Sequence, residues 1–501
     1  MANDVQRLRE RLATVVNLDH AAAVLGWDQQ TYMPPGGARA RGEQLATLTR
    51  LSHEIFTDQE TAHLIDLAEQ EVRSLPPESV DAALTRVARR DYDKATRVPA
   101  SLVAELSRHA VEAHAVWVQA RETADFPMFV PSLQRSVELS RELAEALGYE
   151  DQPYDALLDQ FEPGMKTAQV RDIFTTLRPH LIELVQAVAS SPVKMDAGIL
   201  HQEFDEGKQE HVGRLIATRY GYDFTRGRQD RTVHPFETSF SRDDVRITTR
   251  FDKDFLGSSL FSTLHESGHA MYEQGVGEDL EGTPLAQGAS LGVHESQSRL
   301  WENIVGRSRP FWEYFYPTLQ ETFPERLGQV PMETFYRAVN IVQPSFIRTE
   351  ADEVTYNLHI MLRFEMELGM LDGSIPAVDA NRVWDDLMDQ YLGIRPPNDR
   401  LGILQDVHWS GGMLGYFSTY ALGNILSAQF YAGALRAHPS IPDEIRQGEF
   451  ATLRHWLSEH VYRYGRMDEP NTLIERATGS PLTIEPYLQY LRTKFGELYR
   501  L

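Results

Sequence analysis

The feature that most constrains the fold of this chain is a helical repeat of apolar residues that fills almost all of its first 230 positions. In residues 131–149, for example, the apolar side chains fall on one helical face, Ser132 is placed to cap the start, and Gly148 is placed to end the helix. Helices with one apolar face bury that face by packing against other helices. The sequence therefore predicts a mostly α fold.

The helical repeat is interrupted once, near residue 230. From Val245 to Phe251 the side chains alternate between two faces, which predicts a strand in a small hairpin or sheet. Helical patterns resume at Ser258 and continue to the end of the chain. Because no repeat and no Gly/Ser-rich linker divides the sequence, we expect residues 1–501 to form a single unit.

Composition excludes several classes of protein. The net charge of −24 opposes binding to nucleic acid, and no apolar run approaches the ~18 residues of a membrane span. The chain has no cysteine, so any metal ion must be held by His, Asp or Glu. The N-terminus is charged and lacks the apolar segment of a signal peptide, so we expect a cytoplasmic protein.

Residues 261–270, FSTLHESGHA, contain the pattern HExxH. A helix is expected from about Ser259 to Gln274, capped by Ser258 or Ser259 and ended by Gly275 or Gly277. Residues four apart share a helix face, so His265 and His269 can bind one zinc ion, with Glu266 beside them as a general base. The flanking residues are small or uncharged, which favours a buried metal site over a solvated helix face.

A catalytic zinc ion needs a third protein ligand and one open position for water. The next helical segment, SLGVHESQSRLWENIVG, begins at Ser290, a suitable cap, and offers His294, Glu295 and Glu302. Glu295 and Glu302 lie on the same helix face, so spacing alone does not choose between them as the third ligand.

Several motifs, taken in order, resemble the metallocarboxypeptidase family typified by thermostable carboxypeptidase Taq. The resemblance spans nearly the whole chain, and its motifs are WDQQTYMPPGGARARGEQLA (27–46), HPF (234–236), DVRIT (244–248), HESGH (265–269), HESQS (294–298), IRTEAD (347–352) and GILQDVHW (402–409). It implies that His265, His269 and Glu295 bind the metal and that Glu266 is the base.

The resemblance also implies a fold and an activity. The fold is the mostly helical HExxH fold of gluzincin type, like neurolysin and angiotensin-converting enzyme, with a deep groove and one small β-sheet. The activity is removal of C-terminal residues one at a time with broad specificity, by a homodimer that uses Zn²⁺, with Co²⁺ as a possible activator. On this basis residues 1–230 would wall the groove and supply the dimer contact, and residues 231–501 would carry the metal site.

A carboxypeptidase must also bind the free carboxylate of its peptide substrate. Arg348 is our candidate because an arginine fork donates two parallel hydrogen bonds; the alternative is a salt bridge to Glu350 or Asp352. Arg246 either contacts substrate beside an edge strand or braces the site through Asp244 or Glu295.

The scissile carbonyl oxygen needs hydrogen-bond donors as it gains negative charge. The late segment QDVHWSGGMLGYFSTY offers three such side chains. We expect His408 and Tyr420 to stabilise the oxyanion, as a His and a Tyr do in the converting-enzyme-like peptidases, and Tyr416 to contact substrate.

Two other functions remain open at this point. An endo-oligopeptidase or peptidyl-dipeptidase would use the same metal site and would also cleave peptides with an amidated C-terminus. A binding or scaffold protein with a structural metal would have no need of Glu266 and would tend to fill the fourth coordination position.

Overall fold

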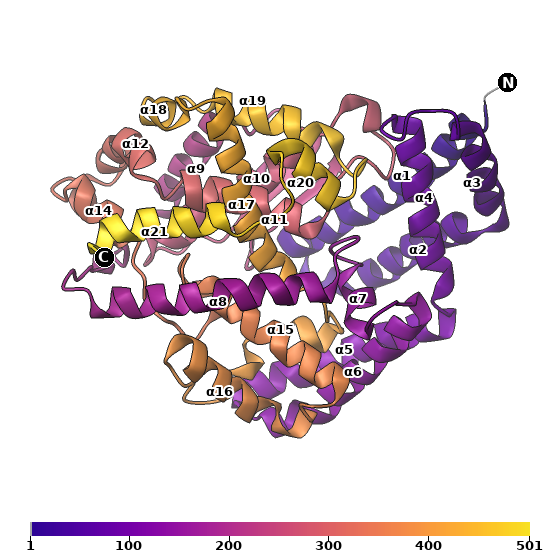
Figure 1. The fold of residues 1–501 in the computed structure, drawn as a ribbon, viewed down its shortest axis with the longest axis horizontal. Coiled ribbons are helices and arrows are strands. Elements are labelled where there is room, and N and C mark those ends of the chain that lie inside the picture. The colour runs from indigo at the N-terminus through magenta and orange to yellow at the C-terminus, as the bar shows by residue number, and fades with distance from the viewer. Residues whose placement is uncertain (1–2) are drawn as a thin grey trace. The chain divides into compact units, whose positions relative to one another are not determined.

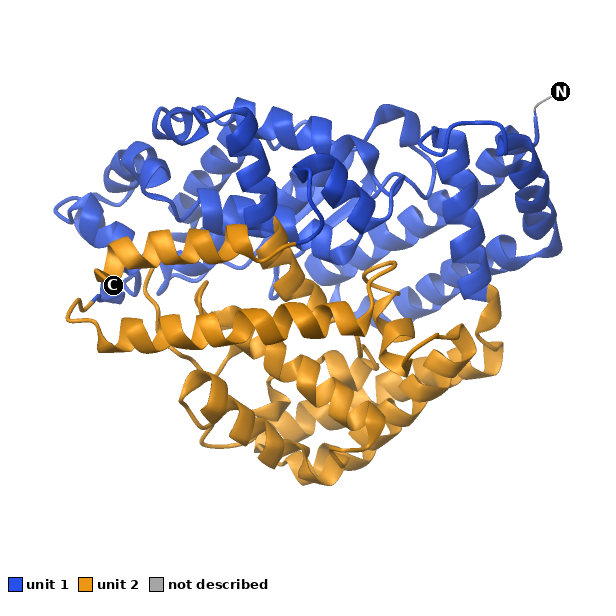
Figure 2. Ribbon diagram, viewed as in Figure 1, with its two compact units in different colours: residues 1–95, 195–339, 427–482 blue, residues 96–194, 340–426, 483–501 orange. Residues whose placement is uncertain are grey.

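The computed structural model describes residues 3–501, which form two compact units (Figure 2). Unit 1 consists of residues 1–95, 195–339 and 427–482, of which residues 1 and 2 lie outside the described part. Unit 2 consists of residues 96–194, 340–426 and 483–501. Each unit therefore combines three separate segments of the chain.

Unit 1 is mostly helical and contains the one small sheet of the described residues (Figure 1). Its helices are α1 (Asp4–Thr31), α2 (Ala38–Thr57), α3 (Gln59–Val72), α4 (Val80–Arg97), α9 (Glu206–Tyr220), α10 (Leu256–Gln274), α11 (Leu291–Arg299), the π-helical turn η4 (Leu300–Val305), α12 (Arg309–Thr322), α13 (Pro324–Leu327), α14 (Met332–Ala338), α18 (Ile441–Arg446), α19 (Ala451–His460) and α20 (Pro470–Thr478). Short 3₁₀ turns lie between these helices at Pro35–Gly37, Gly198–Leu200, Glu278–Leu280 and Tyr462–Tyr464.

The sheet has three strands in the order β1 (Gln229–Arg231), β3 (Asp244–Thr249) and β2 (Glu237–Ser241). β1 runs parallel to the central strand β3, and β2 runs antiparallel to it, with an irregularity between Ser239 and Ser241. Val245 and Ile247 are fully buried, and helix α10 packs against β3. The strand predicted from the alternating pattern is confirmed, and it supports the helix that carries HExxH.

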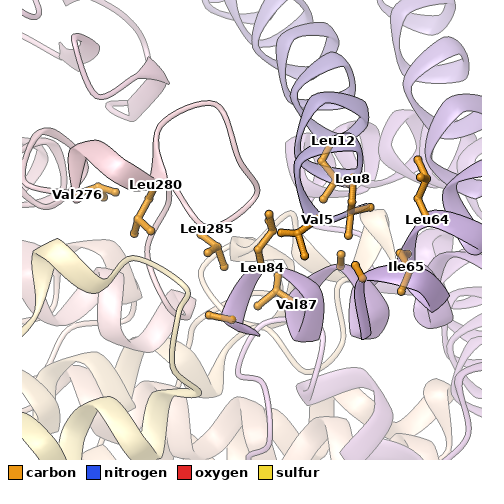
Figure 3. Close-up of a cluster of buried hydrophobic side chains, with 13 residues drawn as sticks. Val5, Leu8, Leu12, Leu64, Ile65, Leu84, Val87, Val276, Leu280 and Leu285 are labelled. Atoms are coloured by element: carbon orange, nitrogen blue, oxygen red, sulfur yellow. The ribbon is translucent and has the colours of Figure 1, made fainter. Parts of the chain in front are cut away.

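A buried apolar cluster joins the N-terminal helices of unit 1 to the segment that follows α10 (Figure 3). Val5, Leu8 and Leu12 come from α1, and further members come from α3 and α4. Val276, Leu280 and Leu285 complete the cluster from the segment directly after the HExxH helix. Helices α1, α3 and α4 therefore share a core with the segment that directly follows the HExxH helix.

The regular elements of unit 2 are all helices or helical turns. Its helices are α5 (Ala100–Thr123), α6 (Phe126–Leu147), α7 (Pro153–Leu158), α8 (Thr167–Ser190), α15 (Tyr356–Asp372), α16 (Ala380–Leu392) and α21 (Glu485–Tyr499), with 3₁₀ turns at η5 (Arg348–Glu350), Ala377–Asp379, η7 (Ile403–Gln405) and η8 (His408–Gly411). Helix α17 (Ser418–Ala437) has residues in both units, and the last two residues of α4 belong to unit 2. The predicted mostly α fold with one small sheet is confirmed.

Two predicted helix starts are wrong by several residues. α6 begins at Phe126, where the side chain of Asp125 accepts the hydrogen bond from Met128 N, so Ser132 lies inside the helix. α10 begins at Leu256, so Ser258 and Ser259 also lie inside a helix, and the Ser259 hydroxyl donates to Gln209 instead of capping. Over residues 3–501, every helix is too short or too polar to cross a membrane.

Candidate metal centre and substrate-binding residues

The HExxH helix α10 turns two imidazoles toward one carboxylate. His265 Nε2 lies 3.5 Å and His269 Nε2 lies 3.4 Å from Glu295 Oε2. The ligand atoms of these three residues all lie within 4.8 Å of one another. Of the two candidates that spacing left open, the structure brings Glu295, and not Glu302, to the Nε2 side of both histidines.

Glu295 is placed by the start of α11 and by its own neighbours. Ser290 caps α11 as predicted, since its side chain accepts from Val293 N. Arg299, one turn later, donates from Nε to Glu295 Oε1 at 2.7 Å, so the other oxygen faces the histidines. The two helices approach closely at Gly268, where a Cβ atom would lie 2.6 Å from Gln297 O.

Glu302 contacts the opposite nitrogen of His265. It lies in the π-helical turn η4, and its Oε2 is 2.8 Å from His265 Nδ1. Burial alone would raise the pKa of Glu302, but Arg299 and the hydrogen bond with His265 lower it to about 2. The ionised carboxylate accepts a hydrogen bond from His265 Nδ1, which leaves the Nε2 lone pair of this histidine facing Glu295.

Burial and charge set the protonation of the other groups at this site. Burial, together with the charges of Glu295 and Glu302, raises the pKa of Glu266 to about 7 against the opposing effect of His265. Burial lowers the pKa of His269 to about 3, with His294 adding to the effect. A general base requires a carboxyl group with a pKa near neutrality, and a histidine metal ligand requires a neutral imidazole.

The donor set fits a divalent metal ion. Two imidazole nitrogens and one carboxylate oxygen converge, while the remaining nitrogens and the second oxygen are engaged by Glu302, His294 and Arg299. Two histidines and a glutamate leave a tetrahedral ion one open position, as catalytic zinc sites do. The residues therefore form a His–His–Glu site for a divalent metal.

Arg246 on β3 is braced by its own strand and by aromatic rings. Its Nε and Nη2 each donate to Asp244, both at 2.8 Å. The guanidinium lies 4.3 Å from the ring of Trp27 and 4.8 Å from that of Phe240. Of the two braces weighed from the sequence, Asp244 is the one that Arg246 contacts.

Arg348 lies in unit 2, where it is buried beside Asp406. Its Nε and Nη2 contact Asp406 Oδ1 at 3.1 and 2.8 Å, and its Nη1 donates to the Tyr356 hydroxyl at 2.8 Å. Arg363 binds the other oxygen of Asp406 from Nε at 2.7 Å. Two guanidinium groups around one carboxylate leave a net positive charge at this point.

Asp352, one of the two acidic neighbours that the sequence offered to Arg348, has other contacts. Asp352 accepts hydrogen bonds from the backbone of Gln343, Val354 and Thr355, so it fixes the turn that begins α15. The partner of Arg348 is instead Asp406, which lies 58 positions away in the GILQDVHW motif. Sequence reasoning missed this residue because nothing local links it to Arg348.

His408, Tyr416 and Tyr420 lie together in unit 2. His408 Nε2 is 3.4 Å from the Tyr420 hydroxyl, and the His408 ring centroid is 5.3 Å from that of Tyr416. The guanidinium of Arg348 lies 4.8 Å from the Tyr420 ring. Burial lowers the pKa of His408 to about 4, and Arg348 and Arg363 act in the same direction against Asp406. At neutral pH this imidazole is therefore uncharged.

An HExxH helix, a glutamate from the following helix at the same point, and a mostly helical chain define a metallopeptidase of the gluzincin class. The chain belongs to the carboxypeptidase Taq (M32) metallopeptidase family, whose model matches residues 7–495. It is thus a metal-dependent peptide hydrolase by family.

Similar proteins cover almost the full chain. Thermostable carboxypeptidase 1 of Thermus thermophilus is 40% identical over 99% of this chain and 98% of its own length. Carboxypeptidase 1 of Bacillus subtilis is 37% identical over 98% of this chain and 97% of its own. The crystal structure of the M32 carboxypeptidase from Deinococcus radiodurans covers 99% of this chain and 100% of its own, with a TM-score of 0.97 and 45% identity.

Proposed function

We propose that the protein is a zinc-dependent carboxypeptidase that releases C-terminal amino acids from peptides one at a time with broad specificity. The observation that carries this proposal is the convergence of His265, His269 and Glu295 beside a buried Glu266 in a chain of the carboxypeptidase Taq family. A structural metal site would have no use for a base with a pKa of about 7.

His265, His269 and Glu295 would hold Zn²⁺, with Co²⁺ as an alternative. When bound, the metal ion supplies Lewis-acid chemistry and lowers the pKa of a water molecule. Arg299 supports this role of Glu295 because it occupies the carboxylate oxygen that faces away from the histidines.

Glu266 accepts the proton from the attacking water and then delivers it to the nitrogen of the leaving amino acid. Its carboxyl pKa of about 7 favours both transfers, because a group that titrates near the working pH gives and takes a proton with similar ease.

Arg348 anchors the C-terminal carboxylate of the substrate, and His408 and Tyr420 stabilise the oxyanion. The net positive charge around Asp406 and the uncharged His408 imidazole support these assignments. Arg246 and Tyr416 contact the substrate chain. Because backbone and carboxylate contacts are common to all peptides, recognition of this kind gives broad specificity.

The proposal also covers the substrates, the cellular location, the oligomeric state and the roles of the two parts of the chain. The partners are peptides with a free C-terminus, and the enzyme acts in the cytoplasm as a homodimer whose contact lies in residues 1–230. Residues 1–501 act as one catalytic unit, in which residues 1–230 wall a deep groove and residues 231–501 carry the metal site.

The test compares N-terminally blocked peptides of three and ten residues, each made with a free-acid and with an amide C-terminus. Each peptide is incubated with the full-length protein, with the chelator-treated protein, and with that protein reloaded with Zn²⁺ or Co²⁺, and the products are read by mass spectrometry. We expect loss of single residues from the free acids alone, abolished by the chelator and restored by the metal.

Equal cleavage of the amides would replace the carboxypeptidase by an oligopeptidase and would remove the anchoring role of Arg348. Absence of cleavage of all four peptides by metal-loaded protein would contradict the proposal and favour a protein with a structural metal.

A further inference from the structure

His294, the residue before the candidate ligand Glu295, connects the metal centre to a second buried carboxylate. Its Nδ1 lies 2.5 Å from His269 Nδ1, and its Nε2 lies 2.8 Å from Glu273 Oε1. Glu273 is buried, with 5% of its surface exposed, and lies one turn after His269 on α10. Three side chains thus form a line from Glu273 to the ring that faces Glu295.

The hydrogen bonds along this line run in one direction when Glu273 is ionised and His294 is neutral. A carboxylate only accepts, so His294 Nε2 must carry the proton that it donates to Glu273. The Nδ1 of a neutral His294 then has a lone pair and accepts from His269 Nδ1–H. His269 Nε2 is left without a proton, and this is the nitrogen that lies 3.4 Å from Glu295 Oε2.

The backbone around Glu273 supports its role as an acceptor. Gly288 N donates to Glu273 Oε1 at 3.0 Å, so the oxygen that faces His294 accepts two hydrogen bonds. A protonated or amidated group at this position could instead donate to His294 Nε2. The line would then reverse and place a proton on His269 Nε2, where a metal ion would have to bind.

The ring of His294 is held in place by its neighbours. A Cβ atom on Gly288 would lie 2.6 Å from His294 Cδ2, so only glycine leaves room for the ring here. On another side, the Tyr272 ring lies 5.3 Å from that of His294, centroid to centroid. This packing fixes the position of the His294 ring between His269 and Glu273.

We propose that Glu273 and His294 are positioning residues that fix the tautomer and the orientation of His269 for metal binding. Glu302 contacts Nδ1 of His265 directly and fixes its tautomer. For His269, the imidazole of His294 stands between Nδ1 and the carboxylate of Glu273. The inference rests on the metal site of the proposed function, and it does not depend on the substrate or on the reaction.

The test measures the Zn²⁺ dissociation constant of the full-length protein by chelator competition, and the visible absorption of the Co²⁺ form. The variants are Glu273→Gln, His294→Gln, His294→Leu and the double variant Glu273→Gln/His294→Gln. We expect Glu273→Gln to weaken Zn²⁺ binding about 10- to 100-fold, as loss of a partner behind a metal ligand does. His294→Gln, which keeps a carbonyl acceptor for His269, should bind more tightly than His294→Leu.

The double variant distinguishes a relay from two independent effects. Because Glu273 acts through His294, the double variant should bind Zn²⁺ no more weakly than the weaker single variant; losses that multiply would overturn the relay. Glu333→Gln and His460→Gln change a glutamate and a histidine of unit 1 that lie in other contacts and should leave the dissociation constant unchanged.

Other outcomes separate this inference from the proposed function. Wild-type affinity in Glu273→Gln, or in His294→Leu if Glu273→Gln does not fold, would refute the relay and leave the metal site intact. Failure of the wild-type protein to bind Zn²⁺ or Co²⁺ would contradict the proposed function itself.

Discussion

Individual side chains at the metal centre are held by contacts on the side away from the metal. Glu295 and Glu302 are seven positions apart, yet one faces both Nε2 atoms and the other contacts a single Nδ1. Arg299 contacts both carboxylates, at 2.7 and 3.2 Å. A single arginine therefore holds two neighbouring carboxylates, Glu295, which faces both histidines, and Glu302, which contacts His265.

Glu266 is the residue whose replacement separates metal binding from chemistry. Since it is not among the converging ligand atoms, Glu266→Gln should retain the metal with a dissociation constant close to that of the wild type. Turnover should fall by about 10²–10⁴-fold, the usual contribution of a general base. Metal content and kcat measured on the same sample check this, and full turnover in metal-loaded Glu266→Gln would disprove the role of this residue.

Helices α10 and α11 of the metal centre pack so closely at one position that a side chain larger than that of glycine does not fit. Helices α10 and α11 approach at Gly268, where a Cβ atom would lie 2.6 Å from Gln297 O and 2.7 Å from Ser298 Cα. Both neighbours are backbone atoms, so they can yield only if α11 moves. The position of Glu295 relative to the two histidines therefore depends on the absence of one methyl group.

Gly268→Ala should displace α11 and with it Glu295. We expect a loss of about 1–3 kcal/mol in the free energy of unfolding, as for other overpacked contacts, together with weaker Zn²⁺ binding. Denaturant unfolding and chelator competition measure the two effects.

Gly26→Ala is the matched control, because Gly26 lies in α1 and a Cβ atom there would meet no atom within 4 Å. It should be neutral or stabilising by about 0.5–1 kcal/mol. If both substitutions behaved alike, the close approach of α10 and α11 would not limit the site.

In unit 2, helix α15 holds the segment that carries His408 through one buried carboxylate. Glu367 accepts hydrogen bonds from Trp409 Nε1 and the Tyr154 hydroxyl, both at 2.8 Å, and from Gly415 N at 3.1 Å. Burial raises the pKa of Glu367 to about 7, against the opposing effect of these hydrogen bonds and of Arg363.

A carboxyl group with a raised pKa in the folded state makes folding less favourable as the pH rises. The folded protein holds a proton on Glu367 that the unfolded chain has lost, between about pH 4.5 and pH 7. Relative to Glu367→Gln, the wild type should therefore lose about 2–3 kcal/mol of unfolding free energy from pH 5 to pH 8.

Denaturant unfolding at the two pH values measures this difference. Glu365→Gln, on the same helix but with a half-exposed side chain paired with Arg178, serves as the control and should show a smaller pH-dependent change. A constant difference between wild type and Glu367→Gln would mean that Glu367 stays ionised throughout.

Across the whole molecule, the proposed tasks are divided between the two units. The three candidate ligands and Glu266 belong to unit 1, whereas Arg348, His408 and Tyr420 belong to unit 2. Substitution of Arg348 should therefore lower turnover without changing metal binding.

Arg348→Lys tests this division. Lysine keeps the charge but loses the planar guanidinium and its contacts to Asp406 and Tyr356, so kcat/KM for free-acid peptides should fall about 10- to 100-fold, mainly through KM. The Zn²⁺ dissociation constant should not change. Arg395→Lys, an exposed arginine of unit 2, is the control. A matching loss of metal affinity would contradict the division, and unchanged kinetics would exclude Arg348 as the anchor.

Contacts between residues close together in the sequence could be predicted, and contacts between residues far apart in the sequence could not. The HExxH spacing placed His265 and His269 on one face because four residues make about one helical turn. The choice between Glu295 and Glu302 was beyond local rules, since it depends on Arg299 and on the π-helical turn at Leu300–Val305.

The features that the sequence did not predict depend mainly on contacts between residues far apart in the chain. The pairing of Arg348 with Asp406 spans 58 positions, and no local pattern encodes it. The wrong start of α10 has a similar origin, because Ser259 finds a partner in Gln209, 50 positions earlier. The division of the chain into two interleaved units likewise follows from packing and leaves no mark in composition.

The interleaving of the two units also bears on how the protein is made. The chain passes between the units five times, so that unit 1 ends at residue 482 and unit 2 at residue 501. During synthesis, the apolar faces of α1, α3 and α4 leave the ribosome long before Val276, Leu280 and Leu285 arrive to complete their cluster. Neither unit can mature on a nascent chain until almost all of it has been translated, and neither can be obtained by cutting the gene in two.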